Sequence, residues 1–263
     1  MEQISSKENI KFKDLKKLLS KSKKRKVVKK FIVEGLKEIK QCLEFEYQLI
    51  ELFISSDIDI KDHKFLEKKI KFTKITHKLY CELAYKKKGD GYIAVFKSKD
   101  FKLENINLPK NPLILVLEAP EKPGNIGAAL RTADAAGVDA VFIANPRTEI
   151  YNPNIIRSSL GSVFTVQICL ANTIEIINFF KAKKIKIFST LIKRSKDYKS
   201  VSYKEPCAII IGKESSSISK EWVENSDQLI KIPMKGKMDS LNLSITAAIV
   251  IFEASNQREN CGS

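Results

Sequence analysis

The sequence predicts two α/β units, the second with a mainly parallel sheet, and three observations support this. Residues 31–97 alternate short strand-like runs with helix-like ones. Residues 99–112, "KDFKLENINLPKNP", are polar, contain two prolines and lack periodicity, as linkers do. From residue 113 onward, apolar runs alternate with helical segments, which is typical of a parallel sheet covered on both faces. We therefore predict domains at 1–105 and 106–263.

The N-terminal part reads as a small α/β/α domain. Its expected strands are "FIV" (31–33), "IELFISS" (50–56), "KFTKIT" (71–76) and "GYIAVFK" (91–97). Its expected helices lie between them, at 34–44, 62–69 and 77–84. In the C-terminal part the expected strands cover 113–118, 140–144, 163–169, 184–190, 207–212 and 228–232.

The charge balance favours a polyanionic partner. Lysine and arginine number 47 against 31 acidic residues, a net charge of +16. Residues 1–108 hold 27 basic and 16 acidic side chains, so 11 of the 16 net charges lie there, and "KSKKRKVVKK" (21–30) is the densest run. Nucleic acid is the first candidate; the alternative is a lysine-rich surface that only keeps the protein dissolved.

Metal, disulfide and membrane chemistry have little material in this chain. The five cysteines are scattered without a C-x-x-C pair, and His63 and His77 are the only histidines. No apolar run approaches the ~20 residues of a membrane span, and the first residues lack a signal core. We expect a cytoplasmic protein without a metal.

The first motif is "APEKPGNIGAALRTADAAGVDAVFI" (119–143). We expect Asn125 to cap a helix that buries Ile126, Leu130, Ala133 and Gly137 on one face. Arg131 falls on the other face, where it is either a ligand-facing guanidinium or an ordinary solvated charge.

The second motif is "AIIIGKESSSIS" (208–219), a buried strand that runs into Gly212. Open α/β sheets bind ligands at the carboxyl ends of their strands, so Gly212 marks a candidate crevice. The string "GKES" does not fit a phosphate loop, and no G-x-G-x-x-G follows a strand, which disfavours nucleotide hydrolases and dinucleotide dehydrogenases.

The third motif is "IPMKGKMDSLNLSITAAIVIFEASNQ" (232–257). We expect Ser240 to cap a helix with a buried stripe. The stripe comprises Leu241, Ile245, Ala248, Ile249 and Phe252. By itself this pattern also fits a well-capped core helix.

Together the three motifs resemble those of the SpoU family of RNA ribose 2′-O-methyltransferases, the TrmH-like branch of the SPOUT superfamily. The matching strings are N-x-G-x-x-x-R from Asn125 to Arg131, G-x-E from Gly212 to Glu214, and I-P-M-x-G-x-x-x-S-L-N from Ile232 to Asn242. The resemblance covers roughly residues 113–258. The segment "KRKVVKKFIVEGLKEIKQCLE" further resembles the ribosomal-protein-like substrate-binding domain that many members carry.

The resemblance implies a C-terminal sheet that forms a trefoil knot around an S-adenosylmethionine pocket. Knots are rare exceptions among folds. By position, the cofactor-binding residues would be Thr190, Leu191, Gly212, Ile232, Met234 and Leu241.

The resemblance also implies methyl transfer to a ribose 2′-hydroxyl, with large-subunit rRNA as the expected substrate and a homodimer as the expected assembly. Arg131 would act on the hydroxyl, and Asn125, Glu214, Ser240 and Asn242 would position it. A guanidinium rarely deprotonates, so we expect Arg131 to stabilise developing negative charge.

Three other functions stay open at this point: a tRNA ribose methyltransferase, a knotted base methyltransferase, and a non-catalytic RNA-binding protein with the same fold. The N-x-G-x-x-x-R string favours ribose over base, and the retained polar residues disfavour a purely electrostatic binder. One departure concerns the pocket, because Ser217 stands where we expect glycine.

Overall fold

The computed structural model describes residues 3–59, 71–85, 89–192, 194–212 and 218–259. It divides into two compact units. The first comprises Met1–Lys99 with Tyr151–Ile156, and the second Asp100–Ile150 with Arg157–Ser263. No described helix is both long and apolar enough to cross a bilayer.

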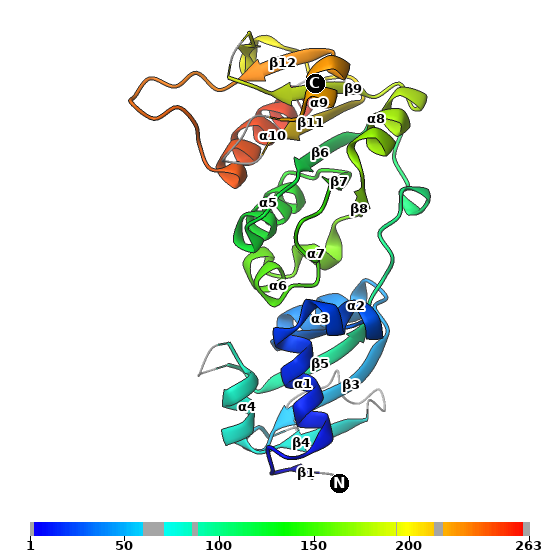
Figure 1. Ribbon diagram of the computed structural model, residues 1–263, viewed down its shortest axis with the longest axis vertical. Coiled ribbons are helices and arrows are strands. Elements are labelled where there is room, and N and C mark those ends of the chain that lie inside the picture. The colour runs from blue at the N-terminus through cyan, green and yellow to red at the C-terminus, as the bar shows by residue number, and fades with distance from the viewer. Residues whose placement is uncertain (1–2, 60–70, 86–88, 193, 213–217, 260–263) are drawn as a thin grey trace. The chain divides into compact units, whose positions relative to one another are not determined.

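The first unit is a five-stranded mixed sheet with helices packed on it (Figure 1). Its strands are β1 (Gln3–Ile4), β2 (Lys30–Glu34), β3 (Leu49–Ser55), β4 (Phe72–Ile75) and β5 (Tyr92–Lys97), in the order β1-β4-β3-β5-β2. Its helices are α1 (Ile10–Ser20), α2 (Ser22–Val28), α3 (Leu36–Glu44) and α4 (His77–Leu83). The expected helix at 62–69 lies outside the described residues.

Helix α1 shows how the first unit builds its core around a basic surface. Phe12, Leu15 and Leu18 recur at helical spacing and are buried against Phe53 and other sheet residues. Arg25 in the basic run is also buried, and its Nη1 donates to the carbonyl oxygens of Leu18 at 2.6 Å and Leu19 at 3.1 Å. Arg25 therefore closes the end of α1 and is not part of the exposed charge.

The second unit confirms the predicted parallel sheet. Seven strands follow the order β10-β12-β9-β11-β6-β7-β8, and all their pairings are parallel. They are β6 (Leu113–Glu118), β7 (Ala140–Ala144), β8 (Ile168–Ala171), β9 (Lys186–Thr190), β10 (Lys196–Asp197), β11 (Cys207–Ile211) and β12 (Gln228–Lys231). The helices are α5 (Pro123–Ala135), α6 (Pro153–Ser159, which straddles both units), α7 (Ser162–Thr165), α8 (Thr173–Ala182), α9 (Lys220–Asn225) and α10 (Leu243–Glu259). Short 3₁₀ turns lie at Leu103–Asn105 and Tyr198–Ser200.

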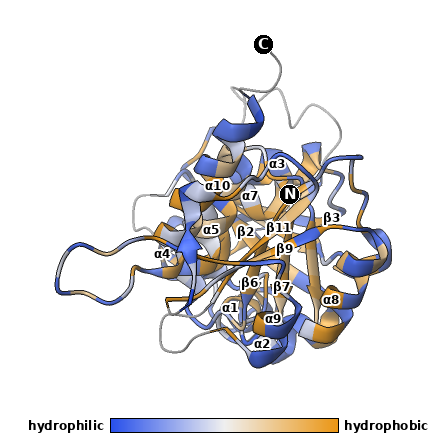
Figure 2. Cartoon of the chain, turned by 90° about the horizontal axis from the view of Figure 1, so that it is seen from above, coloured by the Kyte–Doolittle hydropathy of each residue, from blue (hydrophilic) through white to orange (hydrophobic). Residues whose placement is uncertain are grey.

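Helices cover both faces of this sheet, which explains why its central strands are continuously apolar. On one face, Ile177 and Phe180 of α8 and Trp222 of α9 pack on alternate residues of β6, β7 and β11. On the other face, α5 and α10 pack on each other, and α10 also contacts β6 and β11. Figure 2 shows β6, β9 and β11 largely in the orange of hydrophobic residues.

The predicted strand at 163–169 was wrong over most of its length. The structure forms the helical turn α7 first, and strand β8 starts only at Ile168. Asp134 on α5 explains the turn, because its carboxylate accepts the hydroxyls of Ser162 at 3.2 Å and Thr165 at 2.6 Å. A short apolar run is equally compatible with a buried helix, and these tertiary contacts decide the outcome.

The predicted buried stripe of the last helix was also wrong. Ile245 and Phe252 are 50% and 49% exposed, and the buried residues of α10 are instead Leu243, Ala247, Val250, Ile251 and Ala254. Helix α10 is thus apolar on two faces, one buried in the unit and one exposed on it.

Arg258 fastens the last turn of α10 to the end of the sheet where β6 and β11 begin. Its Nε donates to the carbonyl oxygen of Tyr203 at 2.8 Å, and its Nη1 to that of Asn111 at 2.9 Å. Its Nη2 donates to the carbonyls of Glu205 at 2.7 Å and Pro112 at 3.1 Å. One planar side chain therefore satisfies carbonyls of the segments that lead into β6 and β11.

We expect Arg258→Ala to lower the free energy of unfolding by about 2–4 kcal/mol, since several charge-assisted hydrogen bonds are lost together. Arg258→Lys keeps the charge but not the planar donors, so it should recover only part of the loss. Urea unfolding followed by circular dichroism measures both variants. A change below about 0.5 kcal/mol in Arg258→Ala, the range of ordinary surface substitutions, would contradict this role.

Candidate active site

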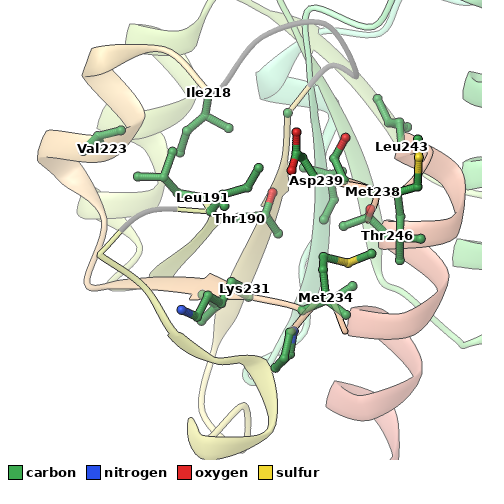
Figure 3. Close-up of a pocket in the computed structure, with 18 of the residues that line it drawn as sticks. Thr190, Leu191, Ile218, Val223, Lys231, Met234, Met238, Asp239, Leu243 and Thr246 are labelled. Atoms are coloured by element: carbon green, nitrogen blue, oxygen red, sulfur yellow. The ribbon is translucent and has the colours of Figure 1, made fainter. Parts of the chain in front are cut away.

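A cavity of about 1170 Å³ opens where β9, β11 and β12 end. The carboxyl ends of parallel strands are where open α/β sheets bind ligands. The walls come from these strand ends, from Ile218 and α9, and from the segment that joins β12 to α10 (Figure 3). All six residues predicted to bind the cofactor line this cavity: Thr190, Leu191, Gly212, Ile232, Met234 and Leu241.

Hydrogen bonds fix the strand ends that form the floor of the cavity. The Thr190 hydroxyl donates to the carbonyl oxygen of Ile210 at 3.0 Å, which ties β9 to β11. The backbone N–H of Leu191 donates to the carbonyl oxygen of Ile230 at 2.9 Å, which extends the pairing of β9 with β12. The floor is therefore set by backbone pairing, with side chains projecting above it.

Gly212 is required by a close approach of the backbone. A Cβ at this position would lie 2.9 Å from Cγ2 and 3.3 Å from the backbone nitrogen of Ile218. Ile218 is buried and also lines the cavity. Ile218 thus lies directly against Gly212, and a side chain at Gly212 would push Ile218 into or away from the cavity.

The cavity has apolar walls and a few charged groups. Ile218, Val223 and Leu191 gather on one side, and Met234, Met238 and Leu243 on the other (Figure 3). Asp239 supplies a carboxylate, and Lys220 and Lys231 supply amines. Apolar walls suit a flat heteroaromatic ring, and separated charges of both signs suit a zwitterionic tail with a sulfonium. These residues fit S-adenosylmethionine, the cofactor that the sequence resemblance implies.

Two asparagines join the starts of α5 and α10. Asn242 Nδ2 donates to Asn125 Oδ1 at 3.2 Å. Asn242 Oδ1 accepts the backbone N–H of Ser244 at 2.9 Å and its hydroxyl at 2.7 Å. The structure therefore brings the polar ends of the first and third motifs into contact, although 117 positions separate these residues.

The same contacts correct two predicted helix caps. Helix α5 begins at Pro123, and its N-cap residue is Lys122, so Asn125 lies within the first turn. Helix α10 begins at Leu243, and Asn242 supplies the side-chain acceptor at its start in place of Ser240. Ser240 lines the cavity instead.

The remaining predicted catalytic residues have different positions. Arg131 is exposed on α5, six residues after Asn125, which is about 9 Å along the helix axis. It does not belong to the cavity lining. Glu214, with Ser215 and Ser217 of the same motif, lies outside the described residues.

Sequence reasoning missed a buried carboxylate at the end of β6. Glu118 is 6% exposed, and its Oε2 accepts Trp222 Nε1–H at 2.7 Å and the Thr173 hydroxyl at 3.0 Å. Asn145 Nδ2 donates to both Glu118 Oε1 at 3.3 Å and Thr173 Oγ1 at 2.9 Å. This network holds α9, and hence Lys220 and Val223 of the cavity wall, against the sheet. The signal was an acidic residue that ends an otherwise apolar strand.

Within the described part of the chain, no three histidine, cysteine, aspartate or glutamate residues are placed to hold a metal ion.

Gly212→Ala should weaken S-adenosylmethionine binding about tenfold, because a strained contact of this size costs about 1–3 kcal/mol and here falls on the cavity wall. Isothermal titration calorimetry measures the affinity. Gly124→Ala is the matched control, since nothing lies within 4 Å of a Cβ at that position and it does not line the cavity. Equal affinities in the two variants would contradict the packing argument.

Comparison with known proteins agrees with the geometry. The sequence model of the SpoU rRNA Methylase family matches residues 112–252, and that of the MRM3-like substrate binding domain matches residues 9–94. The 23S rRNA (guanosine(2553)-2′-O)-methyltransferase RlmP of Bacillus subtilis is 28% identical over 96% of this chain and 98% of its own length. The tRNA (guanosine(18)-2′-O)-methyltransferase of Thermus thermophilus is 34% identical over 61% of this chain and 84% of its own length.

Solved structures give the same assignment. An AdoMet-bound rRNA methyltransferase from Sinorhizobium meliloti matches with a TM-score of 0.88 and 26% identity, over 97% of both chains. An RNA 2′-O ribose methyltransferase matches with a TM-score of 0.85 and 30% identity, over 98% of this chain and 99% of its own. The two curated relatives are named 2′-O-methyltransferases of RNA, and the Sinorhizobium structure holds AdoMet. The chain therefore belongs to the SpoU rRNA methylase family.

Proposed function

We propose that this protein methylates a ribose 2′-hydroxyl of large-subunit ribosomal RNA. The choice of ribosomal RNA rests on how much of this chain each relative matches. The similarity to the Bacillus 23S rRNA enzyme extends over 96% of this chain, including the N-terminal unit, whereas the similarity to the Thermus tRNA enzyme covers 61%. A second 23S rRNA enzyme, from Streptomyces viridochromogenes, matches over 95% of the chain. The N-terminal unit is thus shared with enzymes named for ribosomal RNA.

We assign the cavity to the cofactor and the asparagine pair to the ribose. Bound S-adenosylmethionine supplies an electrophilic methyl group on a positively charged sulfur. Backbone and side chains of Gly212, Met234 and Leu241 would hold it, together with Thr190, Leu191 and Ile232. Asn125 and Asn242 stand where α5 and α10 meet, so their amides can orient the ribose hydroxyl for in-line attack.

The proton on the 2′-hydroxyl has to leave as the oxygen attacks. Arg131 is exposed on the same helix as Asn125. A guanidinium does not serve as an ordinary base in proteins. We assign Arg131 the role of a charged donor that stabilises the developing alkoxide, with the proton passing to water or phosphate. We keep Glu214 and Ser240 as proposed positioning residues.

We also propose that the protein is a homodimer that associates through α10. The outer apolar face of this helix comprises the exposed Ile245 and Phe252 and the partly buried Ala248 and Ile249. These residues recur at helical spacing, and two of them are large side chains that are half exposed. A second copy that packs on this face would bury it, as exposed apolar patches generally require.

A trefoil knot is compatible with the connectivity of the second unit, and we propose that it is present. The segment between β9 and β11 contains β10, which pairs with the outer edge of β12. The same segment then reaches the end of α10, where the Tyr203 N–H donates to Gln257 Oε1 at 3.1 Å. This segment would be the loop through which the C-terminal part is threaded. An electron-density trace with α10 outside the loop would exclude the knot.

We propose that residues 1–105 bind RNA and that residues 106–263 catalyse methyl transfer. Six lysines accompany the buried Arg25 in the run 21–30, and Lys21, Lys23, Lys26 and Lys29 are exposed. Exposed lysines attract phosphates without reading sequence. Selection of RNA over DNA would then come from recognition of the 2′-hydroxyl at the catalytic site.

Methyl transfer to unmodified 23S rRNA should exceed transfer to tRNA transcripts, and the label should sit on a ribose. Radiolabelled S-adenosylmethionine followed by nuclease digestion measures both.

Arg131→Ala should bind the cofactor normally and lose transfer by about 10²-fold or more, as removal of a charge-stabilising donor does elsewhere. Near-normal turnover of Arg131→Ala, or label on a base, would refute the assignment.

Replacing Lys21, Lys23 and Lys26 with glutamine should weaken RNA binding and lower the slope of log affinity against log salt by about 2, since each phosphate contact contributes about 0.7–0.9. The matched control replaces Lys183, Lys184 and Lys196, which are exposed on the second unit. Fluorescence anisotropy at several salt concentrations measures the slopes. The hypothesis fails if both triple variants change the slope equally.

Phe252→Glu should convert the dimer into monomers, because a carboxylate on the apolar face would be buried without a partner. Light scattering after size exclusion gives the mass. Lys237→Gln changes the charge by the same amount, one unit, at an exposed position before α10 and should leave the mass unchanged. A monomeric wild-type protein would rule out the dimer directly.

A further inference from the structure

A cysteine, a histidine and an aspartate of the first unit form a hydrogen-bonded chain that the methyltransferase function does not use. His77 is the first residue of α4, and Cys81 follows one turn later on the same helix face. His77 Nε2 lies 3.3 Å from Cys81 Sγ, and His77 Nδ1 lies 2.9 Å from Asp57 Oδ2. Asp57 comes two residues after the end of β3. These distances place a thiol, an imidazole and a carboxylate in the order found in sites with activated thiols.

Neighbouring groups fix the orientation of the imidazole. The buried Ser55 hydroxyl donates to Asp57 Oδ1, which leaves Oδ2 for His77. The backbone N–H of His77 donates to the Ser56 hydroxyl at 3.3 Å, and its ring stacks on Tyr80 with centroids 6.4 Å apart. A carboxylate that accepts Nδ1–H selects the tautomer with an acceptor at Nε2, which faces the thiol.

The charge states of the groups around His77 and Cys81 are compatible with proton transfer between the two side chains. Hydrogen bonds from Ser55 and His77 hold the pKa of Asp57 below its usual value, so its carboxylate stays ionised. Lys78 and Glu82 are the other charged residues of α4. Glu82 is paired with Lys7 and with Lys16, the latter at 3.8 Å, so its charge is compensated. Burial raises the pKa of Tyr80 to about 12, so this phenol stays neutral.

Cys81 differs from the other described cysteines in exposure. Cys42, Cys169 and Cys207 are buried, while Cys81 is partly exposed. Burial raises the pKa of the Cys42 and Cys207 thiols and brings that of Cys169 to about 12. Thiolates are the reactive form of cysteine, so these three thiols are protected while Cys81 is accessible and next to a base.

We propose that Cys81 is a nucleophilic thiol, activated by His77 and Asp57, that hydroperoxides oxidise to a sulfenic acid. His77 Nε2 takes the thiol proton, and the thiolate sulfur attacks one peroxide oxygen. An S–O bond forms as the O–O bond breaks. The sulfur loses two electrons, the peroxide gains them, and the departing hydroxide takes the proton from His77 to leave as water.

Hydrogen peroxide tests this on the full-length chain with Cys261→Ser as background, because Cys261 lies outside the described residues. Dimedone trapping and mass spectrometry measure the rate of sulfenic acid formation at each cysteine. We expect Cys81 to react at pH 7 at least about tenfold faster than glutathione, and Cys42, Cys169 and Cys207 to stay unmodified. A Cys81 rate within about twofold of glutathione would overturn the proposal.

Variants distinguish a specific effect of His77 and Asp57 on the Cys81 thiol from a general effect of nearby charge. His77→Gln should lower the Cys81 rate at least about fivefold, and Asp57→Asn should lower it less, because the base is kept but misoriented. Lys78→Gln is the matched control: it changes a charge on the same helix and should alter the rate less than about twofold. Equal effects of His77→Gln and Lys78→Gln would overturn the assignment of His77. Thermal melts measure whether each variant folds. Folding is expected, because the substituted side chains are exposed.

Discussion

Helix α10 is held by hydrogen bonds at both of its ends, and these attachments position the segment that lines the candidate site. At its start, Asn242 caps the helix and contacts Asn125 of α5. At its end, Arg258 binds carbonyls of the segments that lead into β6 and β11. The segment between β12 and α10, which carries Met234 and Ser240, therefore lies at the carboxyl ends of the strands and forms a cavity wall.

This arrangement separates stability from chemistry along one helix. Arg258 uses hydrogen bonds to backbone carbonyls, which serve the fold whatever the ligand. Asn242 uses one amide for three contacts, so the same group that caps the helix faces the proposed ribose site. The exposed apolar face between the two ends, with Ile245 and Phe252, serves neither purpose within one chain, which is why we assign it to the dimer.

Much of the second unit could be predicted from its sequence, because its strands are buried on both faces and read as unbroken apolar runs. The candidate crevice at Gly212 followed from the rule that ligands bind at the carboxyl ends of strands. The assignment of Ile232, Met234 and Leu241 followed only from the family resemblance. The errors have a common physical origin. Periodicity defines a helix face but not what covers it, so the stripe with Ile245 was assigned to the core. Asp134 turned an apolar run into helix α7 through contacts that lie 28 and 31 residues away in sequence.

Polar networks were the least predictable feature. Glu118 joins Trp222 and Thr173 across 104 and 55 positions, and no local pattern announces such a contact. The pairing of His77 with Asp57 likewise depends on how α4 sits beside the end of β3. Two of the predicted catalytic residues, Asn125 and Asn242, proved to be in contact, whereas Arg131 is exposed further along α5.

The most direct test of the central claim is a crystal structure of the full chain with S-adenosylhomocysteine, the demethylated product of the cofactor. The account predicts density in the cavity between Thr190 and Leu241, with the sulfur directed toward the Asn125 and Asn242 pair. Density at another surface, or a sulfur directed away from the two asparagines, would contradict it.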